Sequence, residues 1–296
     1  MSAPGPTRQS ERRGHGARLS YYDFGRTTAY CCQSDPRFSY CAYVPESYAE
    51  DGTDHYRLLV AVHGSRREMV AYRDAFIALA ERRRLIVLAP LFPAGILAVD
   101  DHSSYKMLRV GAMHYDAVLF AMIAELQARY RLYIDRFSLF GFSGGAQFAQ
   151  RFFYLHPERL SALSIAAPGV VTLLDFERDH WVGVRDFAER FGKPLDLNAM
   201  RRLPVQMVVG AEDKDTWEIT IKPGDPWWRP DANAAGADRP ARLEALKASF
   251  EAHGLAVRRD VVPGVAHTLP GLIPVVEDFF DCAFVGESDR LDSWSA

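Results

Sequence analysis

The first part of the chain has the residue pattern of paired β-strands. Residues 27–33, TTAYCCQ, and residues 37–45, RFSYCAYVP, flank the turn-forming residues Ser34, Asp35 and Pro36. Two short strand-like runs that are separated by a polar turn predict an antiparallel hairpin. We therefore expect the folded part of the chain to begin with such a hairpin.

From residue 56 onward, short apolar runs alternate with longer amphipathic runs. The apolar runs predict buried strands, at residues 56–64, 85–93, 137–143, 159–168, 204–210 and 255–264. The amphipathic runs predict helices, at residues 69–84, 105–130, 144–156, 239–254 and 270–284. Continuously apolar strands that alternate with helices are typical of a parallel sheet covered on both faces. The predicted fold class is α/β, with a mostly parallel central sheet and an N-terminal antiparallel hairpin.

This pattern describes a single domain at residues 21–286, because it contains neither an internal repeat nor a linker. Two irregular stretches interrupt it, a small insertion at about 169–203 and a tryptophan-rich loop at about 214–236. We expect residues 1–20 to form a disordered basic tail and residues 287–296 to form a flexible C-terminus.

Composition and charge narrow the class of partner. The 296 residues are 48% hydrophobic and 12% aromatic, which is enough to bury a large core without disulfides. The formal net charge of -3 favours neither nucleic acid nor an anionic membrane as a partner, so we expect a small or oligomeric substrate. The oligomeric state stays open. Reduced cysteines are the expectation, with a bridge from Cys31 or Cys32 to Cys41 as the alternative.

The sequence also gives an expectation about the compartment. Residues 1–20 contain arginines but no apolar run of the length that a signal peptide requires. No stretch of the sequence approaches the roughly 20 apolar residues that cross a bilayer. We expect a cytoplasmic protein.

Ser143 lies between Gly141 and Gly145 in the sequence GFSGG, where a predicted strand meets a predicted helix. The pattern G-x-S-x-G also arises by chance, and an ordinary glycine-rich turn is its alternative interpretation. The strand before it and the helix after it are the context of a nucleophile elbow, in which a sharp turn raises the serine Oγ above the sheet. We therefore predict that Ser143 is a nucleophile.

An acid and a histidine follow Ser143 in the order that such an elbow requires. Asp213 follows the predicted strand 204–210 within the sequence AEDKD, and Asp215 is the alternative for the acid. His267 lies in the loop between the last predicted strand and the last predicted helix, and it is the best placed of the nine histidines. The predicted catalytic residues are Ser143, Asp213 and His267.

Two backbone N–H groups are candidates for an oxyanion hole. Gly144 is the first residue of the helix after Ser143, so its N–H points toward the turn. Ser65 follows His63 and Gly64 at the end of the first parallel strand, where the N–H of Ser65 would point at the same oxyanion. The alternative for the His-Gly pair is a simple turn that ends the strand.

With these motifs, VHGS, GFSGG, VGAEDKD and VPGVAH, the chain resembles an α/β-hydrolase from about Tyr40 to Phe284. Within that superfamily it is most similar to the polyhydroxybutyrate-depolymerase-like esterases, whose plan poly(aspartic acid) hydrolases share. The resemblance implies the α/β-hydrolase fold and acyl transfer through an acyl-enzyme. It implies no metal or organic cofactor, and the chain has neither an HExxH motif nor a cysteine cluster.

The sequence indicates the type of reaction more clearly than it indicates the substrate. Aromatic and basic residues on the loops around the elbow are candidates for binding it, namely Arg66, Lys106, Trp181, Trp217, Trp227 and Trp228. The tryptophans would line an apolar pocket or simply pack the long loops, and the basic residues would attract an anionic substrate or only be solvated.

Three functions remain on this evidence. An esterase acting on a carboxylic ester, which includes a polyester or oligoester, is the leading prediction. The second is an amidase or peptidase of an anionic substrate such as poly(aspartic acid). The third is a non-catalytic α/β-hydrolase-fold binding protein, which commonly lacks one member of the triad.

Overall fold

The computed structural model describes residues 19–132 and 135–292, and for residues 286–292 only the backbone. Its core is a nine-stranded sheet in the order β1-β3-β5-β4-β8-β9-β10-β11, with β2 also paired to β3. The strands are β1 Gly25–Arg26, β2 Tyr30–Cys31, β3 Ser39–Val44, β4 Arg57–Val62, β5 Leu85–Leu91, β8 Phe137–Phe142, β9 Leu160–Ala166, β10 Val205–Gly210 and β11 Val257–Val262.

Strand direction follows the sequence prediction. The six strands from β5 to β11 in the sheet order are all parallel, and β1, β2 and β3 pair antiparallel at the other edge. The prediction of a mostly parallel sheet with an N-terminal hairpin is therefore confirmed. Because parallel strands end at the same edge of a sheet, the loops after β4, β8, β10 and β11 meet there.

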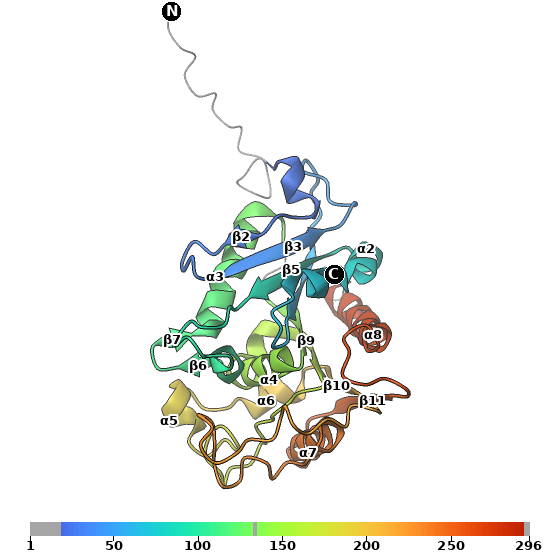
Figure 1. The fold of residues 1–296 in the computed structure, drawn as a ribbon. Coiled ribbons are helices and arrows are strands. Elements are labelled where there is room, and N and C mark those ends of the chain that lie inside the picture. The colour runs from blue at the N-terminus through green and yellow to red at the C-terminus, as the bar shows by residue number, and fades with distance from the viewer. Residues whose placement is uncertain (1–18, 133–134, 293–296) are drawn as a thin grey trace, which may run out of the picture.

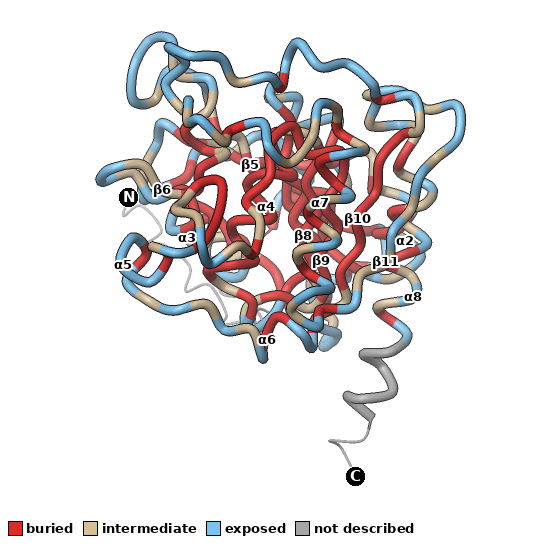
Figure 2. Tube along the Cα trace, turned by 90° about the horizontal axis from the view of Figure 1, so that it is seen from below, coloured by how far each residue is buried: buried red, intermediate tan, exposed pale blue. Residues whose placement is uncertain are grey.

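Helices cover both faces of this sheet (Figure 1). α2 packs against α8, while α3 and α4 lie on the opposite side. The helices are α1 Met69–Asp74, α2 Ile77–Arg83, α3 Tyr115–Arg129, α4 Gly144–Leu155, α5 Phe187–Phe191, α6 Leu197–Arg201, α7 Arg239–Ala252 and α8 Ile273–Asp292, with short 3-10 turns η1 Tyr21–Asp23, η2 Ser104–Met107 and η3 Pro157–Arg159. Figure 2 shows that the buried residues are concentrated in the strands and in α4, inside a rim of exposed loops.

Two predicted helices differ from those observed. The helix expected at 105–130 begins only at Tyr115, because Leu108 and Gly111 adopt positive φ angles of 68° and 57° and the chain forms a small hairpin of β6 Arg109–Val110 and β7 Met113–His114. The helix expected at 69–84 is divided into α1 and α2, since Phe76 leaves the helical conformation with φ -111° and ψ 15°.

The two predicted irregular stretches differ in content. The insertion expected at 169–203 contains α5 and α6, whereas the loop expected at 214–236 contains turns but neither helix nor strand. α8 runs to Asp292 and so takes in the first part of the range 287–296 that was expected to be flexible. The predicted tail at 1–20 falls almost entirely outside the described residues.

All four cysteines are free thiols in this structure. Cys31 lies opposite Ser39 in the antiparallel pair of β2 and β3, two positions away from Cys41 along β3. The alternative of a disulfide to Cys41 is therefore wrong for this structure. Burial raises the pKa of the Cys41 thiol, which keeps it protonated and unreactive.

A buried ion-pair cluster fastens the start of α3 to the end of α4. The Asp116 carboxylate is 2.8 Å from His156 Nε2 and 2.6 Å from an Arg109 nitrogen, and its side chain is 1% exposed. Burial alone would raise the pKa of Asp116, but the hydrogen bonds from His156 and Arg109 outweigh it and hold that pKa well below its ordinary value.

In the described part of the chain, no helix has the combination of length and apolar character needed to cross a membrane.

Candidate active site

Ser143 sits in a sharp turn between β8 and α4. Its backbone adopts φ 56° and ψ -113°, a conformation that is strained for any residue with a side chain. A Cβ atom on Gly141 would lie 2.1 Å from the Gly145 carbonyl oxygen, and a Cβ on Gly145 would lie 2.1 Å from the Val62 carbonyl oxygen. Glycine is therefore required on both sides of Ser143, as the elbow interpretation predicts.

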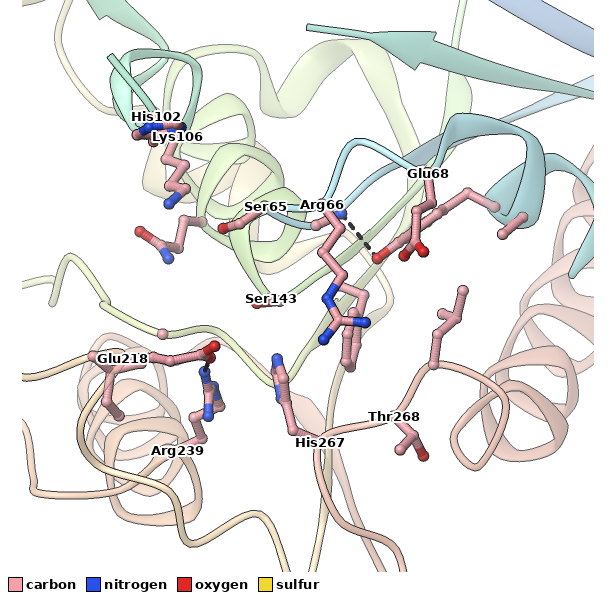
Figure 3. A pocket seen from close by; sticks show the side chains of 18 of the residues that line it. Ser65, Arg66, Glu68, His102, Lys106, Ser143, Glu218, Arg239, His267 and Thr268 are labelled. Atoms are coloured by element: carbon pink, nitrogen blue, oxygen red, sulfur yellow. Dashed lines mark hydrogen bonds and ion pairs between the residues drawn. The ribbon is translucent and has the colours of Figure 1, made fainter. Parts of the chain in front are cut away.

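The two candidate oxyanion residues are neighbours. Gly144 begins α4, and a Cβ atom placed on it would lie 3.1 Å from Ser65 Oγ. Ser65 follows the end of β4 and lies above Ser143 in the pocket (Figure 3). The fold thus brings Ser65 and Gly144, which are 79 residues apart in the sequence, close together beside Ser143.

A buried histidine fixes the turn that carries Ser65. The Phe92 N–H donates to His63 Nε2 at 2.9 Å, so Nδ1 carries the ring proton and donates to the Gly64 carbonyl at 2.8 Å. Burial lowers the pKa of His63 to about 4, which keeps the ring neutral. Gly64 also donates its N–H to the Tyr72 hydroxyl at 2.8 Å. With the Gly64 carbonyl held, the N–H of the same peptide group, that of Ser65, points the opposite way.

The acid and the histidine are in direct contact. His267 Nδ1 lies 2.6 Å from Asp213 Oδ2, and Asp213 is 1% exposed. The imidazole stacks on the Phe142 ring with 4.6 Å between centroids, and Figure 3 shows it pointing toward Ser143. The alternative acid, Asp215, is exposed and lies two residues further along the loop. The geometry therefore favours Asp213 over Asp215 as the partner of His267.

Close packing of two loops sets this contact. A Cβ atom on Gly210, the last residue of β10, would lie 2.1 Å from the Val265 carbonyl oxygen. The Glu212 N–H donates to the same carbonyl at 2.9 Å. The loop that carries Asp213 and the loop that carries His267 are thus joined through the backbone, directly after the parallel pair of β10 and β11.

Arg239 is a site residue that the sequence analysis missed. It is the first residue of α7, its side chain is 2% exposed, and it donates to Asp213 Oδ1 at 3.0 Å and to Glu218 Oε2 at 2.9 Å. A basic residue in the first turn of a helix opposes the helix dipole. Nothing in the local sequence indicates that this arginine reaches a carboxylate 26 residues away.

Ser143 opens into a cavity of about 1420 Å³. Three of the six predicted substrate-binding residues line it, namely Arg66, Lys106 and Trp217. Figure 3 shows Arg66 extending into the pocket toward His267. The pocket wall also carries three acidic side chains, Glu68, Glu218 and Asp225, so its charge is mixed.

The other three tryptophans are absent from the described wall of this cavity. Trp181 is 4% exposed and packs in a small apolar cluster with Met107, Val170 and Val182, and its indole N–H donates to the Trp227 carbonyl at 2.9 Å. Trp228 is 42% exposed. The alternative that tryptophans pack the long loops therefore describes Trp181 and Trp227 better than a pocket role does.

Lys106 is the pocket cation with the most altered environment. Burial is the main cause that lowers its pKa, to about 8, and the nearby Arg67 and Arg151 contribute. Its ammonium donates to Ser103 Oγ at 3.3 Å. Gln147, also on the pocket wall and missed in the sequence, has a buried Oε1 with no hydrogen-bond partner among the described residues. A group that donates a hydrogen bond would satisfy this oxygen.

Comparison with known proteins gives structural relatives only. No protein-family model and no curated sequence matches the chain. A poly(aspartic acid) hydrolase from Sphingomonas sp. KT-1 superimposes with a TM-score of 0.69 at 22% identity, over 86% of this chain and 98% of that one. A poly(3-hydroxybutyrate) depolymerase from Bordetella parapertussis gives 0.64 at 24% identity, over 82% and 83% of the two chains.

A third relative is an S-formylglutathione hydrolase from Agrobacterium tumefaciens, with a TM-score of 0.57 at 16% identity over 88% of this chain and 95% of that one. The structural relatives also include esterases and other serine hydrolases. Likeness at these identities describes the arrangement of helices and strands. The expectation from the resemblance is confirmed at that level: this chain has the α/β-hydrolase fold.

Proposed function

We propose that this protein is a serine hydrolase that cleaves a carboxylic ester through an acyl-enzyme on Ser143. The observation that carries the proposal is the 2.6 Å contact between His267 Nδ1 and the buried carboxylate of Asp213, beside a serine in a strained elbow. A carboxylate on Nδ1 selects the tautomer whose free Nε2 can accept the serine proton. That is the chemistry a serine nucleophile requires.

In the acylation step, Ser143 attacks the ester carbonyl while His267 takes its proton. Asp213 stabilises the imidazolium that forms, and the N–H groups of Ser65 and Gly144 bind the tetrahedral oxyanion. His267 then gives the proton to the departing alkoxide. Water repeats the sequence on the acyl-enzyme and releases the acid, which returns Ser143 to its starting state.

The structural relatives support this proposal through what their names describe. They include a poly(3-hydroxybutyrate) depolymerase, a ferulic acid esterase and an S-formylglutathione hydrolase. Each of these names describes an enzyme that cleaves an ester or a thioester. A cavity of about 1420 Å³ is large for a short-chain ester alone. An oligoester that occupies several positions along the pocket is consistent with that size.

Labelling with a fluorophosphonate tests the proposal. We expect one adduct on the wild-type protein by intact mass and none on Ser143→Ala. Ser161→Ala is the matched control, because that serine lies in β9 and outside the described wall of the pocket. An unlabelled wild-type protein would contradict the proposal and favour a non-catalytic binding protein.

An amidase or peptidase of an anionic substrate is the second candidate, and the observation that favours it is Lys106 in the pocket wall close to Gly144. A carboxylate-bearing substrate would then show a KM that rises with ionic strength. Charge reversal in Lys106→Glu should raise that KM further and weaken its salt dependence. Unchanged kinetics in Lys106→Glu would remove this candidate.

A further inference from the structure

We infer that Arg239 is a positioning residue that joins the catalytic acid to one wall of the substrate pocket. This inference rests on the proposed function, since it assigns Arg239 a role in the same site. One branch of its guanidinium holds Asp213 and the other holds Glu218, so the acid and this part of the wall are linked through one side chain. Figure 3 shows the pair of Arg239 and Glu218 on the pocket wall.

The contacts divide the guanidinium between two carboxylates. Nη1 is 3.0 Å from Asp213 Oδ1, and Nη2 is 2.9 Å from Glu218 Oε2. Nε is buried without a partner among the described residues. The two carboxylates are therefore what holds the end of this side chain in place.

Asp213 depends on its contact with Arg239 because its side chain is shielded from water. Its side chain is 1% exposed, and one of its oxygens is committed to His267. A buried carboxylate without a compensating charge is strongly disfavoured. Arg239 supplies that charge on the second oxygen. Its hydrogen bond to Oδ1 limits rotation of the carboxylate, which keeps Oδ2 directed toward Nδ1 of His267.

Glu218 lies at the other end of the ion-pair chain and faces the pocket. Its side chain is 46% exposed, and it lines the cavity together with its neighbour Trp217, which is 73% exposed. These residues belong to the loop at 214–236, which has no helix or strand of its own. The pair with Arg239 is therefore one attachment of this wall to the body of the domain, beside the hydrogen bond from Arg242 to the Ile219 carbonyl at 2.9 Å.

The two contacts predict different kinetic effects. Glu218→Gln should loosen this part of the wall without disturbing Asp213, because it removes the charge that pairs with Arg239. KM should therefore rise about threefold to tenfold while kcat stays within twofold of wild type. Arg239→Gln should disturb both, with kcat at least tenfold lower and KM raised as in Glu218→Gln. In the double variant, KM should equal that of Arg239→Gln, because Glu218 acts through the arginine that is no longer present.

Arg239→Lys adds a variant that keeps the charge. A lysine has one ammonium in place of the two-pronged guanidinium, so it can hold Asp213 but not both carboxylates in the same geometry. We expect kcat close to wild type and KM close to that of Glu218→Gln. This variant also keeps the inference testable if Arg239→Gln fails to fold.

Glu244→Gln is the control for Glu218→Gln. Glu244 also makes an ion pair with an arginine at 2.7 Å and is half-exposed, but it lies on α7 and outside the described pocket wall. Its kcat and KM should match wild type. Additive effects of Glu218→Gln and Arg239→Gln on KM, or a wild-type kcat in a folded Arg239→Gln, would overturn the inference.

The rate of fluorophosphonate labelling separates this inference from the proposed function. A wild-type protein that does not label refutes the proposed function itself. A wild-type protein that labels, with Arg239→Gln labelling at the same rate, refutes only the role of Arg239. At saturating probe, where the rate no longer depends on binding, we expect Arg239→Gln to label at least tenfold more slowly and Glu218→Gln to label at the wild-type rate.

Discussion

Gly145→Ala is the substitution whose consequence the structure defines most closely. The new Cβ would lie 2.1 Å from the Val62 carbonyl oxygen and 2.7 Å from that of His63. Both are backbone atoms of the β4 end, so no side chain can rotate away, and α4 must move by about 1 Å to restore normal contact distances. Alanine is the better helix former by roughly 0.5–1 kcal/mol, but overpacking typically costs about 1–3 kcal/mol and outweighs it.

The displaced groups are those that the proposed mechanism uses. Moving the start of α4 by about 1 Å shifts the Gly144 N–H and Ser143 Oγ, and a shift of that size can lower a rate by about 100-fold. We expect the melting temperature to fall by several degrees, at roughly 2–4 °C per kcal/mol for a large domain, and kcat/KM on a p-nitrophenyl ester to fall by 10-fold to 100-fold.

Gly192→Ala separates the two effects. Gly192 has φ 76° and no heavy atom within 4 Å of an added Cβ, so the substitution costs about 1–2 kcal/mol of backbone strain without a clash. It should lower the melting temperature but leave kcat/KM unchanged. If Gly145→Ala keeps wild-type kcat/KM, the reasoning about a crowded elbow is refuted.

Three further predictions follow from other parts of the site and core. Gly210→Ala should displace the loop that carries His267 and lower kcat/KM at least tenfold, measured on the same ester. Because the pKa of Lys106 is lowered to about 8, its positive charge is present below that pH and lost above it, so the KM for a carboxylate-bearing ester should rise between pH 7 and 9, and Lys106→Met should abolish this rise. Asp116→Asn should lower the free energy of unfolding by about 3 kcal/mol at pH 7 in denaturant titrations. Since the pKa of Asp116 is lowered in the folded state, its stabilising contribution is present above about pH 4 and is lost as the pH falls further. If the difference in free energy of unfolding between wild type and Asp116→Asn does not shrink in acid, the ion-pair account is contradicted.

The parts of the fold that could be predicted from the sequence are those that local pattern determines. The elbow at Ser143 follows from an apolar strand, two glycines and an amphipathic helix, all within residues 137–156. The position of His267 after the last strand follows from strand order alone. The helix start at Tyr115 did not follow, because apolar residues at helical spacing continue back to residue 105 while a left-handed turn at Gly111 interrupts the backbone.

The contacts that tertiary packing creates were out of reach. Arg239 meets Asp213 only because the end of β10 and the start of α7 lie side by side, which no spacing in the sequence encodes. For the same reason, nothing in the sequence distinguished Trp181 from Trp217. Trp181 is buried in the apolar loop cluster, whereas Trp217 lines the pocket. Residue type alone carries no information about which side of a long loop faces a cavity.

The position of β11 at the edge of the sheet sets how the site would fail under stress. Among the described strands, β11 pairs with β10 alone, and its residues are only partly buried or exposed, whereas every residue of β8 is buried. Local opening draws on the least-protected segments first, so amide protons of β11 should exchange faster than those of β8. His267 is attached to this strand and Ser143 to the other. In mild denaturant, the imidazole would therefore leave the serine while most of the sheet remained folded, and hydrolysis would cease before the tertiary structure melted.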